Sequence, residues 1–380
     1  MSPSLSEMFP LSRYFTPEDL RRGAEWMRTE NLSSLVILFI DSALLFVASF
    51  GRTGRALWDR LDQPLGREWR TGAAFLAIVA LARNVVILPV SLFVLREQHL
   101  LGLSHEGLPS FLRRVLVTSF GMMLGGALLG AGLGAVRQRF PRRWWLIVGL
   151  AASVVLIADT VLVPLRAQMD FQVRPLPAGT LRTRLDKLLD EKHVPPTPLY
   201  VIDDSRYGTE ANAWFTGLGP TRRIIVTDTL LAFGDEAVVG AIAHEIGHRR
   251  TERLPGQLAF ACVGLFLFLG VLEWCLRFAA RRGTPETARG IPFAMWMVGM
   301  IMLVLLPWRA ARGRAEEREA DEVEFSARHD YDAYIAEQVR IVRANAFHPD
   351  PPAFWKLLED HPTPAERIDR ALWYKSRLSQ

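Results

Sequence analysis

The sequence predicts a multi-pass bundle of membrane helices joined to one small α+β domain. Six apolar stretches are long enough to cross a bilayer, and two polar segments of ordinary globular composition flank the last two stretches. Short β-rich runs lie in the first of these polar segments. Half of the 380 residues are hydrophobic although 22% are charged, so the apolar residues are concentrated rather than spread through a soluble core. This composition excludes disordered and collagen-like chains.

Each predicted span has about 20 mostly apolar residues. The six stretches are 32–50, 72–95, 115–136, 144–165, 257–279 and 291–308. No cleavage pattern of a signal peptide precedes the first stretch, so it is expected to be a span. The chain therefore divides into a polar N-terminal segment (1–31), a four-span region (32–165), a globular segment (166–256), two further spans (257–308) and a second globular segment (309–380).

The number of spans predicts how these segments are placed. Two spans separate the globular segments, which therefore lie on the same side of the membrane and can form one domain, with the N-terminus on that side. Arginines at the domain's flanks favour the cytoplasm. Arg greatly outnumbers Lys, which favours a bacterial source and hence the inner membrane. No basic run is interleaved with aromatic residues, so we expect membrane lipids as partners and no nucleic acid.

Several spans contain polar or small residues that need partners. Charge inside hydrocarbon is costly, so charged residues should pair with one another or face a wet interior. Glycines at four-residue spacing let helices approach closely. The charged or polar positions are Asp41, Arg83, Asn84, Asp159 and Glu273, and the third span contains Gly121, Gly125, Gly126, Gly130, Gly132 and Gly134.

The string His-Glu-Ile-Gly-His at 244–248 carries the chemistry. It continues an apolar helical pattern, so His244 and His248, four residues apart, share one helix face and can bind one metal ion. Glu245 is then placed to take a proton from a water molecule at that metal. A pair of helical histidines with an incidental acid is the alternative. Burying polar side chains in so apolar a helix costs free energy unless they have partners, which favours the metal site.

A hydrolytic zinc site usually has a third protein ligand and an open position. The two cysteines, Cys262 and Cys275, are too few for a Cys-based site and lie in one apolar run. After the last span, Glu317 and Asp321 lie four residues apart, so one can bind zinc while the other accepts the second N–H of a ligand histidine. Spacing alone leaves Glu316 and Glu319 open as the third ligand, and a solvated acidic helix is the structural alternative.

The β-rich runs predict a small sheet beside this helix. Residues 199–202 and 224–226 are short β-rich runs, with Gly217, Gly219 and Pro220 punctuating the chain between them. A strand at the sheet edge could pair with an extended peptide. A purely structural hairpin, in which Asn212 caps a turn, is the alternative.

Together these motifs resemble the type I CAAX prenyl proteases, a family of integral-membrane zinc metalloproteases. The matching segments are His244–His248, Glu317 to Asp321, Asn212–Gly217, Arg223–Leu231, His361-Pro362 with Arg367-Ile368, and Leu88-Pro89 with Glu97. The family typically has seven spans and this sequence has six. The segment from Tyr14 to Asn31 resembles the stretch just after the family's first span.

The resemblance implies a zincin-like metalloprotease domain with one Zn²⁺ per chain. It implies His244, His248 and Glu317 as ligands, Glu245 as general base and then acid, and Asp321 behind a ligand histidine. The edge strand Asn212, Ala213, Trp214 and Phe215 would align the substrate, and His361 and Arg367 would lie near the metal. There they could steady an oxyanion. A structural His-Pro turn with an arginine ion pair is the alternative for these two residues.

The sequence therefore predicts a zinc metalloendopeptidase that acts on membrane-associated peptides or proteins, with prenylated CAAX-type substrates among them. One alternative is a quality-control protease with loose specificity. Another is a non-catalytic transporter or lipid-binding protein with a structural zinc, in which Glu245 would be dispensable. A receptor or scaffold would explain none of the predicted zinc residues.

Overall fold

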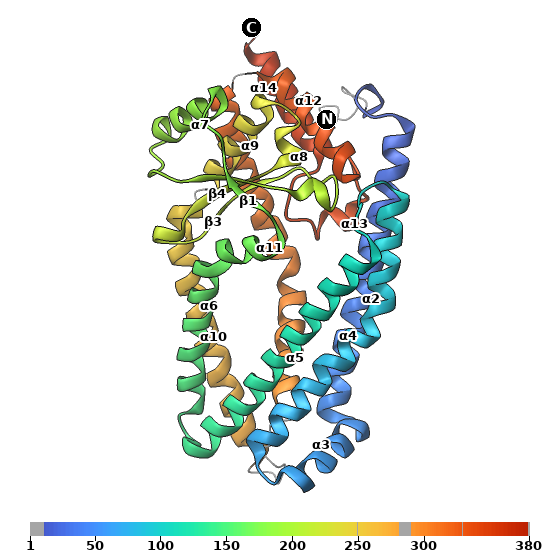
Figure 1. The fold of residues 1–380 in the computed structure, drawn as a ribbon, viewed down its shortest axis with the longest axis vertical. Coiled ribbons are helices and arrows are strands. Elements are labelled where there is room, and N and C mark those ends of the chain that lie inside the picture. Colours follow the sequence, from blue (N-terminus) through green and yellow to red (C-terminus); the bar gives the residue numbers. More distant parts are fainter. Residues whose placement is uncertain (1–10, 249, 281–289, 329, 379–380) are drawn as a thin grey trace, which may run out of the picture.

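A computed structural model describes residues 11–378 of the chain, apart from 249, 281–289 and 329. Long helices stand side by side over most of the length of the molecule, and the sheet and shorter helices gather at one end (Figure 1). Six of the described helices are long and apolar enough to cross a membrane, which confirms the predicted bundle with a small mixed α/β part. The protein is a multi-pass membrane protein.

The six long helices follow the six predicted spans and extend beyond them. They are α2 (Pro17–Phe50), α4 (Glu68–Leu100), α5 (Leu108–Arg139), α6 (Trp144–Asp170), α10 (Arg250–Ala280) and α11 (Gly290–Arg328). Their outward side chains include Phe39, Phe260 and Val304, which are 74–78% exposed and match a lipid environment. A further helix, α3 (Arg52–Leu65), lies in the loop between the first two spans.

Two of these helices extend past the boundaries that hydrophobicity predicts. Helix α2 begins at Pro17, inside the predicted polar N-terminal segment, because Thr16 and Asp19 cap it reciprocally: each side chain accepts the other's backbone N–H, at 3.1 and 2.9 Å. Residues 1–10 of that segment lie outside the described residues. Helix α11 continues through Pro307 and carries the last span directly into Glu317 and Asp321.

Charges within the spans are paired, as predicted. The guanidinium of Arg83 on α4 donates to both carboxylate oxygens of Asp41 on α2, at 2.6 and 2.9 Å. Glu273 on α10 accepts from the Trp144 indole of α6 at 2.5 Å and from Arg277. The Arg83–Asp41 contact joins α4 to α2 and the Trp144–Glu273 contact joins α6 to α10, whereas Arg277 lies on α10 itself. Cys262 carries a free thiol, and the side chain of Cys275 is outside the described part of the chain.

The glycines of α5 let it approach α4 closely. A Cβ atom at Gly126, Gly130 or Gly134 would lie 3.0, 2.2 or 2.7 Å from α4 backbone atoms, which confirms the predicted packing role for these three. Gly121, Gly125 and Gly132 have open space instead.

We expect Gly130→Ala to lower the thermal stability of the purified protein, because the added methyl would overlap the carbonyl oxygen of Gly72. Overpacking of this kind costs about 1–3 kcal/mol. The matched control is Gly132→Ala on the same helix, where the methyl meets no atom within 4 Å. Thermal unfolding in detergent should show a fall of several degrees for the first variant only; equal midpoints would contradict the packing role.

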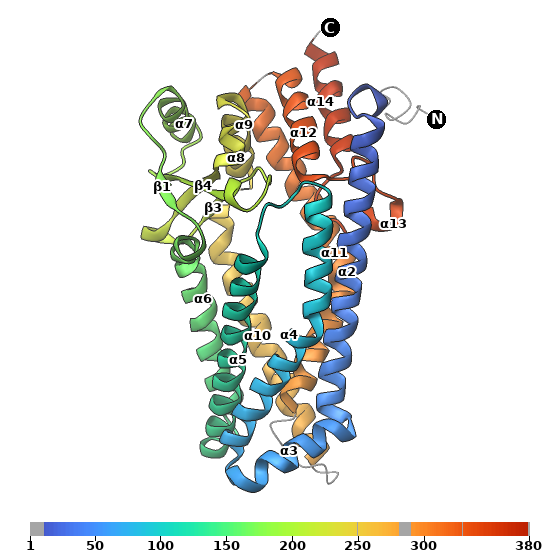
Figure 2. The same ribbon diagram turned by 45° about the vertical axis from the view of Figure 1, so that its right-hand side comes forward.

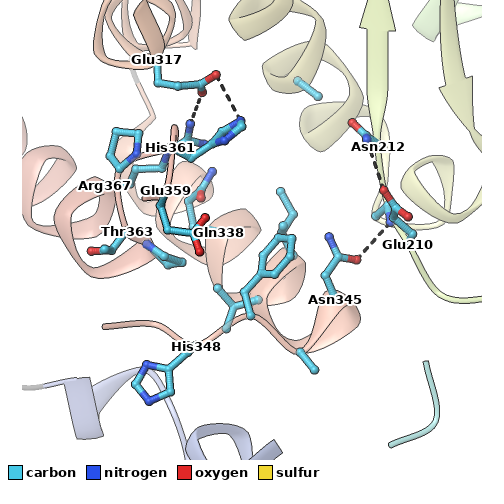
Figure 3. A pocket seen from close by; sticks show the side chains of 18 of the residues that line it. Glu210, Asn212, Glu317, Gln338, Asn345, His348, Glu359, His361, Thr363 and Arg367 are labelled. Carbon is cyan, nitrogen blue, oxygen red and sulfur yellow. Dashed lines mark hydrogen bonds and ion pairs between the residues drawn. The ribbon is translucent and has the colours of Figure 1, made fainter. Parts of the chain in front are cut away.

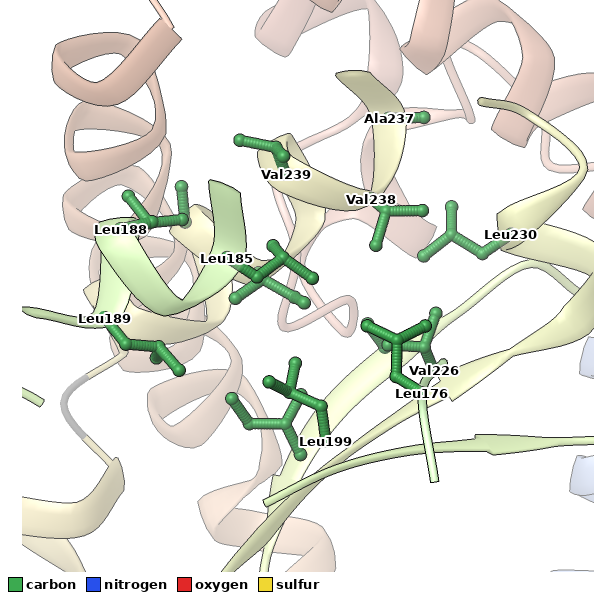
Figure 4. Close-up of a cluster of buried hydrophobic side chains, with 14 of the residues drawn as sticks. Leu176, Leu185, Leu188, Leu189, Leu199, Val226, Leu230, Ala237, Val238 and Val239 are labelled. Carbon is green, nitrogen blue, oxygen red and sulfur yellow. The ribbon is translucent and has the colours of Figure 1, made fainter. Parts of the chain in front are cut away.

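The sheet has four strands in the order β1-β2-β4-β3. They are β1 (Val173–Pro175), β2 (Leu199–Ile202), β3 (Ala213–Thr216) and β4 (Arg223–Thr227). Strands β2 and β4 are parallel and the other neighbours are antiparallel, which leaves β3 at one edge. Helices α7 (Thr180–Glu191) and α9 (Asp235–Gly247) pack on the sheet through a buried apolar core that includes Leu185, Ile224 and Val238 (Figure 4).

The remaining helices complete the end of the molecule that contains the sheet. They are α8 (Asp228–Leu231), α12 (Tyr331–Asn345), α13 (Ala353–Lys356) and α14 (Pro364–Leu378), with short 3₁₀ turns at Leu11–Arg13, Asp204–Arg206 and Gly219–Thr221. A second core around Phe325 and Tyr334 joins α11, α12 and α14, and Phe15 just before α2 packs into it. The start of α2, the sheet and α14 therefore lie at the same end (Figure 2).

Candidate metal centre

Helix α9 brings His244 and His248 onto one face. Asp235 and Glu236 in its first turn favour the helix N-terminus, and Val238 and Ile242 anchor it in the core. The two imidazole rings lie with their centroids 4.8 Å apart. Each side chain is only 10–13% exposed.

The crossing of α9 and α11 brings the acidic residues to these histidines. A Cβ atom at Gly247 would lie 2.5 Å from the Cα of Ala320, so the helices touch backbone to backbone. Ala320 lies between Glu317 and Asp321 on α11. The close approach therefore directs both carboxylates toward α9.

Glu317 is the residue on which the site converges. Its Oε2 lies 3.2 Å from His244 Nε2, and its Oε1 lies 3.2 Å from His248 Nε2. His361 Nε2 lies 3.2 Å from Oε1, and the Arg367 guanidinium donates to Oε2 at 2.5 Å (Figure 3). The Glu317 side chain is 8% exposed.

Each of the two imidazole nitrogens lies at a metal-ligand spacing from the Glu317 carboxylate. Zinc binds imidazole nitrogen and carboxylate oxygen at about 2.0–2.1 Å, so tetrahedral ligand atoms lie about 3.3 Å apart. The separations of 3.2 Å between the two imidazole nitrogens and the Glu317 oxygens match that spacing. Ligand atoms of His244, Glu245 and His248 also lie within 4.8 Å of one another. His244, His248 and Glu317 are thus a donor set that could hold a divalent metal ion.

Asp321 contacts the other side of the His244 ring. Its Oδ1 lies 3.1 Å from His244 Nδ1, and the Asp321 side chain is 1% exposed. Burial lowers the pKa of the imidazole, but the two carboxylate acceptors, Asp321 and Glu317, outweigh burial and raise the pKa of His244 to about 10. The metal-free site therefore holds a proton on His244 at neutral pH.

The site opens into a cavity of about 770 Å³. Its lining comes from α2, the edge strand β3, α9, α12 and the segment around His361, and includes Trp26, Trp214, Glu245 and Arg367. Figure 3 shows Glu317, His361 and Arg367 on one wall, with Asn212 and Glu210 on the other. Glu245 faces this cavity while only 9% exposed.

Most of the sequence-predicted residues line this one cavity. His244, Glu245, His248, Glu317, His361, Arg367, Asn212, Ala213 and Trp214 lie along it, and Asp321 lies behind His244. The side chain of Phe215 is instead packed in the core of the sheet, so only its backbone can take part in binding. Glu316 and Glu319, the other possible third ligands, pair with Arg312 and Arg253 at 3.0 and 2.8 Å.

The structure also brings residues to His244 that the sequence pattern did not single out. Glu324 Oε2 lies 3.9 Å from His244 Nδ1, and Arg328 joins Glu324 to Glu337 of α12. Glu324 and Arg328 continue the face of α11 that carries Glu317 and Asp321, at spacings of three and four residues. This spacing along α11 could have identified Glu324 and Arg328 from the sequence. Nothing in the sequence pattern indicated that Glu337 of another helix joins them.

The long apolar helices, the mixed sheet with a free edge, and two histidines in contact with a carboxylate beside a cavity define an integral-membrane protein with a metallopeptidase-type site. Residues 175–374 match the model of peptidase family M48. The chain belongs to peptidase family M48.

Comparisons with individual proteins agree with this assignment. The chain is 28% identical over 243 residues to the CAAX prenyl protease 1 homolog of Arabidopsis thaliana, covering 62% of this chain and 56% of that protein. It is 20% identical over 376 residues to the uncharacterized metalloprotease YhfN of Bacillus subtilis, covering 94% and 86%. The chain thus spans about half the length of the plant relative.

A solved structure supports the fold. The crystal structure of S. mikatae Ste24p superposes with a TM-score of 0.80 at 20% sequence identity, covering 97% of this chain and 93% of that one. At this level of identity the match establishes a shared fold. The family match and the curated CAAX prenyl protease relatives confirm the resemblance seen in the sequence motifs.

Proposed function

We propose that this protein is a zinc metalloendopeptidase that hydrolyses membrane-associated peptides or proteins. One observation carries the proposal: the Nε2 atoms of His244 and His248 both face the Glu317 carboxylate at 3.2 Å, beside Glu245 in a cavity. Two imidazoles and a carboxylate suit zinc among divalent ions. When bound there, zinc would act as a Lewis acid and supply a reactive nucleophile at neutral pH.

The residues around the metal position would transfer protons, orient a ligand and stabilise the oxyanion. Glu245 takes a proton from the attacking water and returns it to the leaving amine. Asp321 Oδ1 lies 3.1 Å from His244 Nδ1, on the side of the ring away from Glu317, and would hold the ring orientation. His361 and Arg367 lie on the cavity wall, where they can act as positively charged hydrogen-bond donors and stabilise the developing oxyanion.

The edge strand is the part of the site that aligns a peptide. The backbone N–H of Thr227 donates to the Asn212 carbonyl, so Asn212 turns its backbone toward β4. Backbone groups alternate sides along a strand, and Trp214 and Thr216 therefore also face β4. Ala213 and Phe215 present their N–H and C=O groups to the open edge. A substrate in extended conformation can pair there without demands on its side chains.

Such pairing predicts a period-two pattern in substrate recognition. We expect N-methylation of alternate backbone amides on one side of the scissile bond to lower kcat/KM about five- to tenfold, because each removes one hydrogen bond of about 1 kcal/mol. Methylation of the intervening amides should matter much less. A series of singly N-methylated peptides checks this, and a uniform response along the peptide would contradict strand pairing.

The pKa of His244 predicts how zinc affinity depends on pH. The imidazole must lose its proton to bind the ion, and that proton is held up to about pH 10. Apparent zinc affinity should therefore rise about tenfold per pH unit between pH 6 and 8, with proton release on binding. Calorimetry in buffers of different ionisation enthalpy measures that release. Affinity that is flat with pH would contradict a protonated metal-free site.

The membrane setting favours substrates that are lipid-modified or membrane-tethered, and the CAAX prenyl protease relatives make a prenylated peptide the first to test. The test is cleavage of a quenched fluorescent peptide, with and without a farnesyl cysteine, by detergent-purified zinc-loaded protein. Faster cleavage of the farnesylated peptide supports a CAAX-type substrate. Equal cleavage of both favours loose quality-control proteolysis. Bound zinc without turnover of any peptide would favour the transporter or lipid-binding alternative.

We further propose that the protein lies in a bacterial inner membrane with its zinc site on the cytoplasmic side. Arginines such as Arg309 and Arg312 at the end of the last predicted span support this orientation. A reporter fused after Gln380 that is active only in the cytoplasm should be active, and an inactive fusion would reverse the orientation.

A further inference from the structure

A second cluster of buried charge lies directly behind the proposed metal site. The guanidinium of Arg328 at the end of α11 donates to Glu324 Oε1 at 2.8 Å and also to Glu337 of α12. All three side chains are only 3–4% exposed. Burying two carboxylates and one guanidinium is costly, so this arrangement calls for a reason beyond packing.

The cluster touches the histidine that faces Glu317. Glu324 Oε2 lies 3.9 Å from His244 Nδ1, the same ring nitrogen that Asp321 Oδ1 contacts at 3.1 Å. The opposite nitrogen of the ring faces Glu317. Two carboxylates from one helix therefore flank Nδ1. Arg328 supplies the cation that holds Glu324 in place.

Helix α9 keeps a space for this guanidinium. Gly240 lies one helical turn before His244, and a Cβ atom there would lie 1.9 Å from Arg328 Nη1 and 2.6 Å from Glu324 Oε1. Glycine in a helix interior costs about 1 kcal/mol relative to alanine. The space that it leaves brings Arg328 against the backbone of the helix that carries His244.

We propose that Arg328, seated against Gly240 between Glu324 and Glu337, is a positioning residue for His244. It holds the Glu324 carboxylate beside Nδ1, so that Glu324 and Asp321 together fix the ring with Nε2 directed at the metal position. The proposal rests on the proposed function only in that zinc binds at His244, His248 and Glu317. It assigns Arg328, Glu324 and Gly240 a part in metal affinity and ligand geometry.

The first test uses Gly240→Ala and Arg328→Met in the full-length protein. Loss of outer partners of a metal ligand typically lowers metal affinity about 10–100-fold. We expect such a loss for each variant, measured by competition with a chelator, and a changed visible spectrum of the cobalt-substituted protein. The control Gly256→Ala, where a Cβ would meet no atom within 4 Å, should leave both unchanged.

The double variant makes the test specific. The alanine methyl acts mainly by displacing the Arg328 guanidinium, so the loss of zinc-binding free energy in Gly240→Ala combined with Arg328→Met should be clearly smaller than the sum of the two single losses. Additive losses would mean that Gly240 acts independently of Arg328 and would overturn the proposed coupling.

A variant that removes all three charges of the cluster tests the proposal if Arg328→Met alone fails to fold. The triple variant Arg328→Met, Glu324→Gln and Glu337→Gln leaves no unpaired buried charge in the cluster. A folded triple variant with weakened zinc binding supports positioning. Wild-type zinc affinity and an unchanged cobalt spectrum would show that the cluster only joins α9, α11 and α12, and would overturn the proposal. The proposed function fails in a different way, when the wild-type protein itself binds no zinc or cleaves no peptide.

Discussion

Glu245→Gln is expected to lower peptide cleavage about a thousandfold while the protein still binds zinc, because a general base of this kind contributes about 10²–10⁴ in rate. The amide keeps the size of the carboxylate but cannot accept the proton of the attacking water. Glu245 lies between His244 and His248 and faces the cavity, and neither histidine changes. Single-turnover cleavage and metal content, measured on the same sample, check the result.

A matched control lies on the same helix. Glu236 in the first turn of α9 makes an exposed ion pair with Arg184 at 2.7 Å, away from the cavity, so Glu236→Gln should keep full activity. If Glu245→Gln retained cleavage with zinc bound, the proton transfer would have to be assigned elsewhere and the non-catalytic alternative would gain support.

Glu317→Ala is expected to abolish zinc binding and to destabilise the metal-free protein. The Glu317 carboxylate contacts His244, His248 and His361 at 3.2 Å, and Arg367 at 2.5 Å. Its removal deletes a ligand and takes a carboxylate partner away from Arg367 and from the protonated His244. Breaking a buried pair from one side costs about 3–5 kcal/mol. Arg367 keeps Asp321 at 3.6 Å, so we expect the lower part of that range.

Chelator competition and thermal unfolding measure the two effects separately. The matched controls are Glu316→Ala and Glu319→Ala, which remove acids of the same helix whose partners are the solvent-side Arg312 and Arg253. Both controls should bind zinc with unchanged affinity. Loss of zinc in either control, with binding retained in Glu317→Ala, would move the third ligand to a neighbouring position.

The sequence could predict those parts of the site that depend on spacing along one helix. His244 with His248, and Glu317 with Asp321, each lie four residues apart, so α-helical geometry alone places each pair on one face. The spans followed from their length and apolarity in the same way. The choice among Glu316, Glu317 and Glu319 needed the family resemblance, because all three lie within one turn and composition does not separate them.

The rest depended on contacts between segments far apart in the chain. The crossing of Gly247 on Ala320 sets which carboxylate meets the histidines, and one backbone contact leaves little trace in local sequence. The close contact between the Arg328 guanidinium and Gly240 likewise joins α11 to α9, so local sequence does not predict it. Helix α2 began earlier than its hydrophobicity suggested, since the cap at Thr16 sets its start and Phe15 just before it packs into the core of α11, α12 and α14.

Helix α11 connects the candidate metal site directly to the membrane-spanning region. It runs unbroken from Gly290 to Arg328, so Glu317 sits about 14 Å along the same rod from Trp308, where the predicted span ends. A helix answers a thicker or thinner hydrocarbon layer mainly by changing its tilt. A change of tilt that α9 does not share would move Glu317 relative to His244 and His248, which belong to that helix. We therefore expect the protein reconstituted in thin and in thick bilayers to hold its metal with different strength.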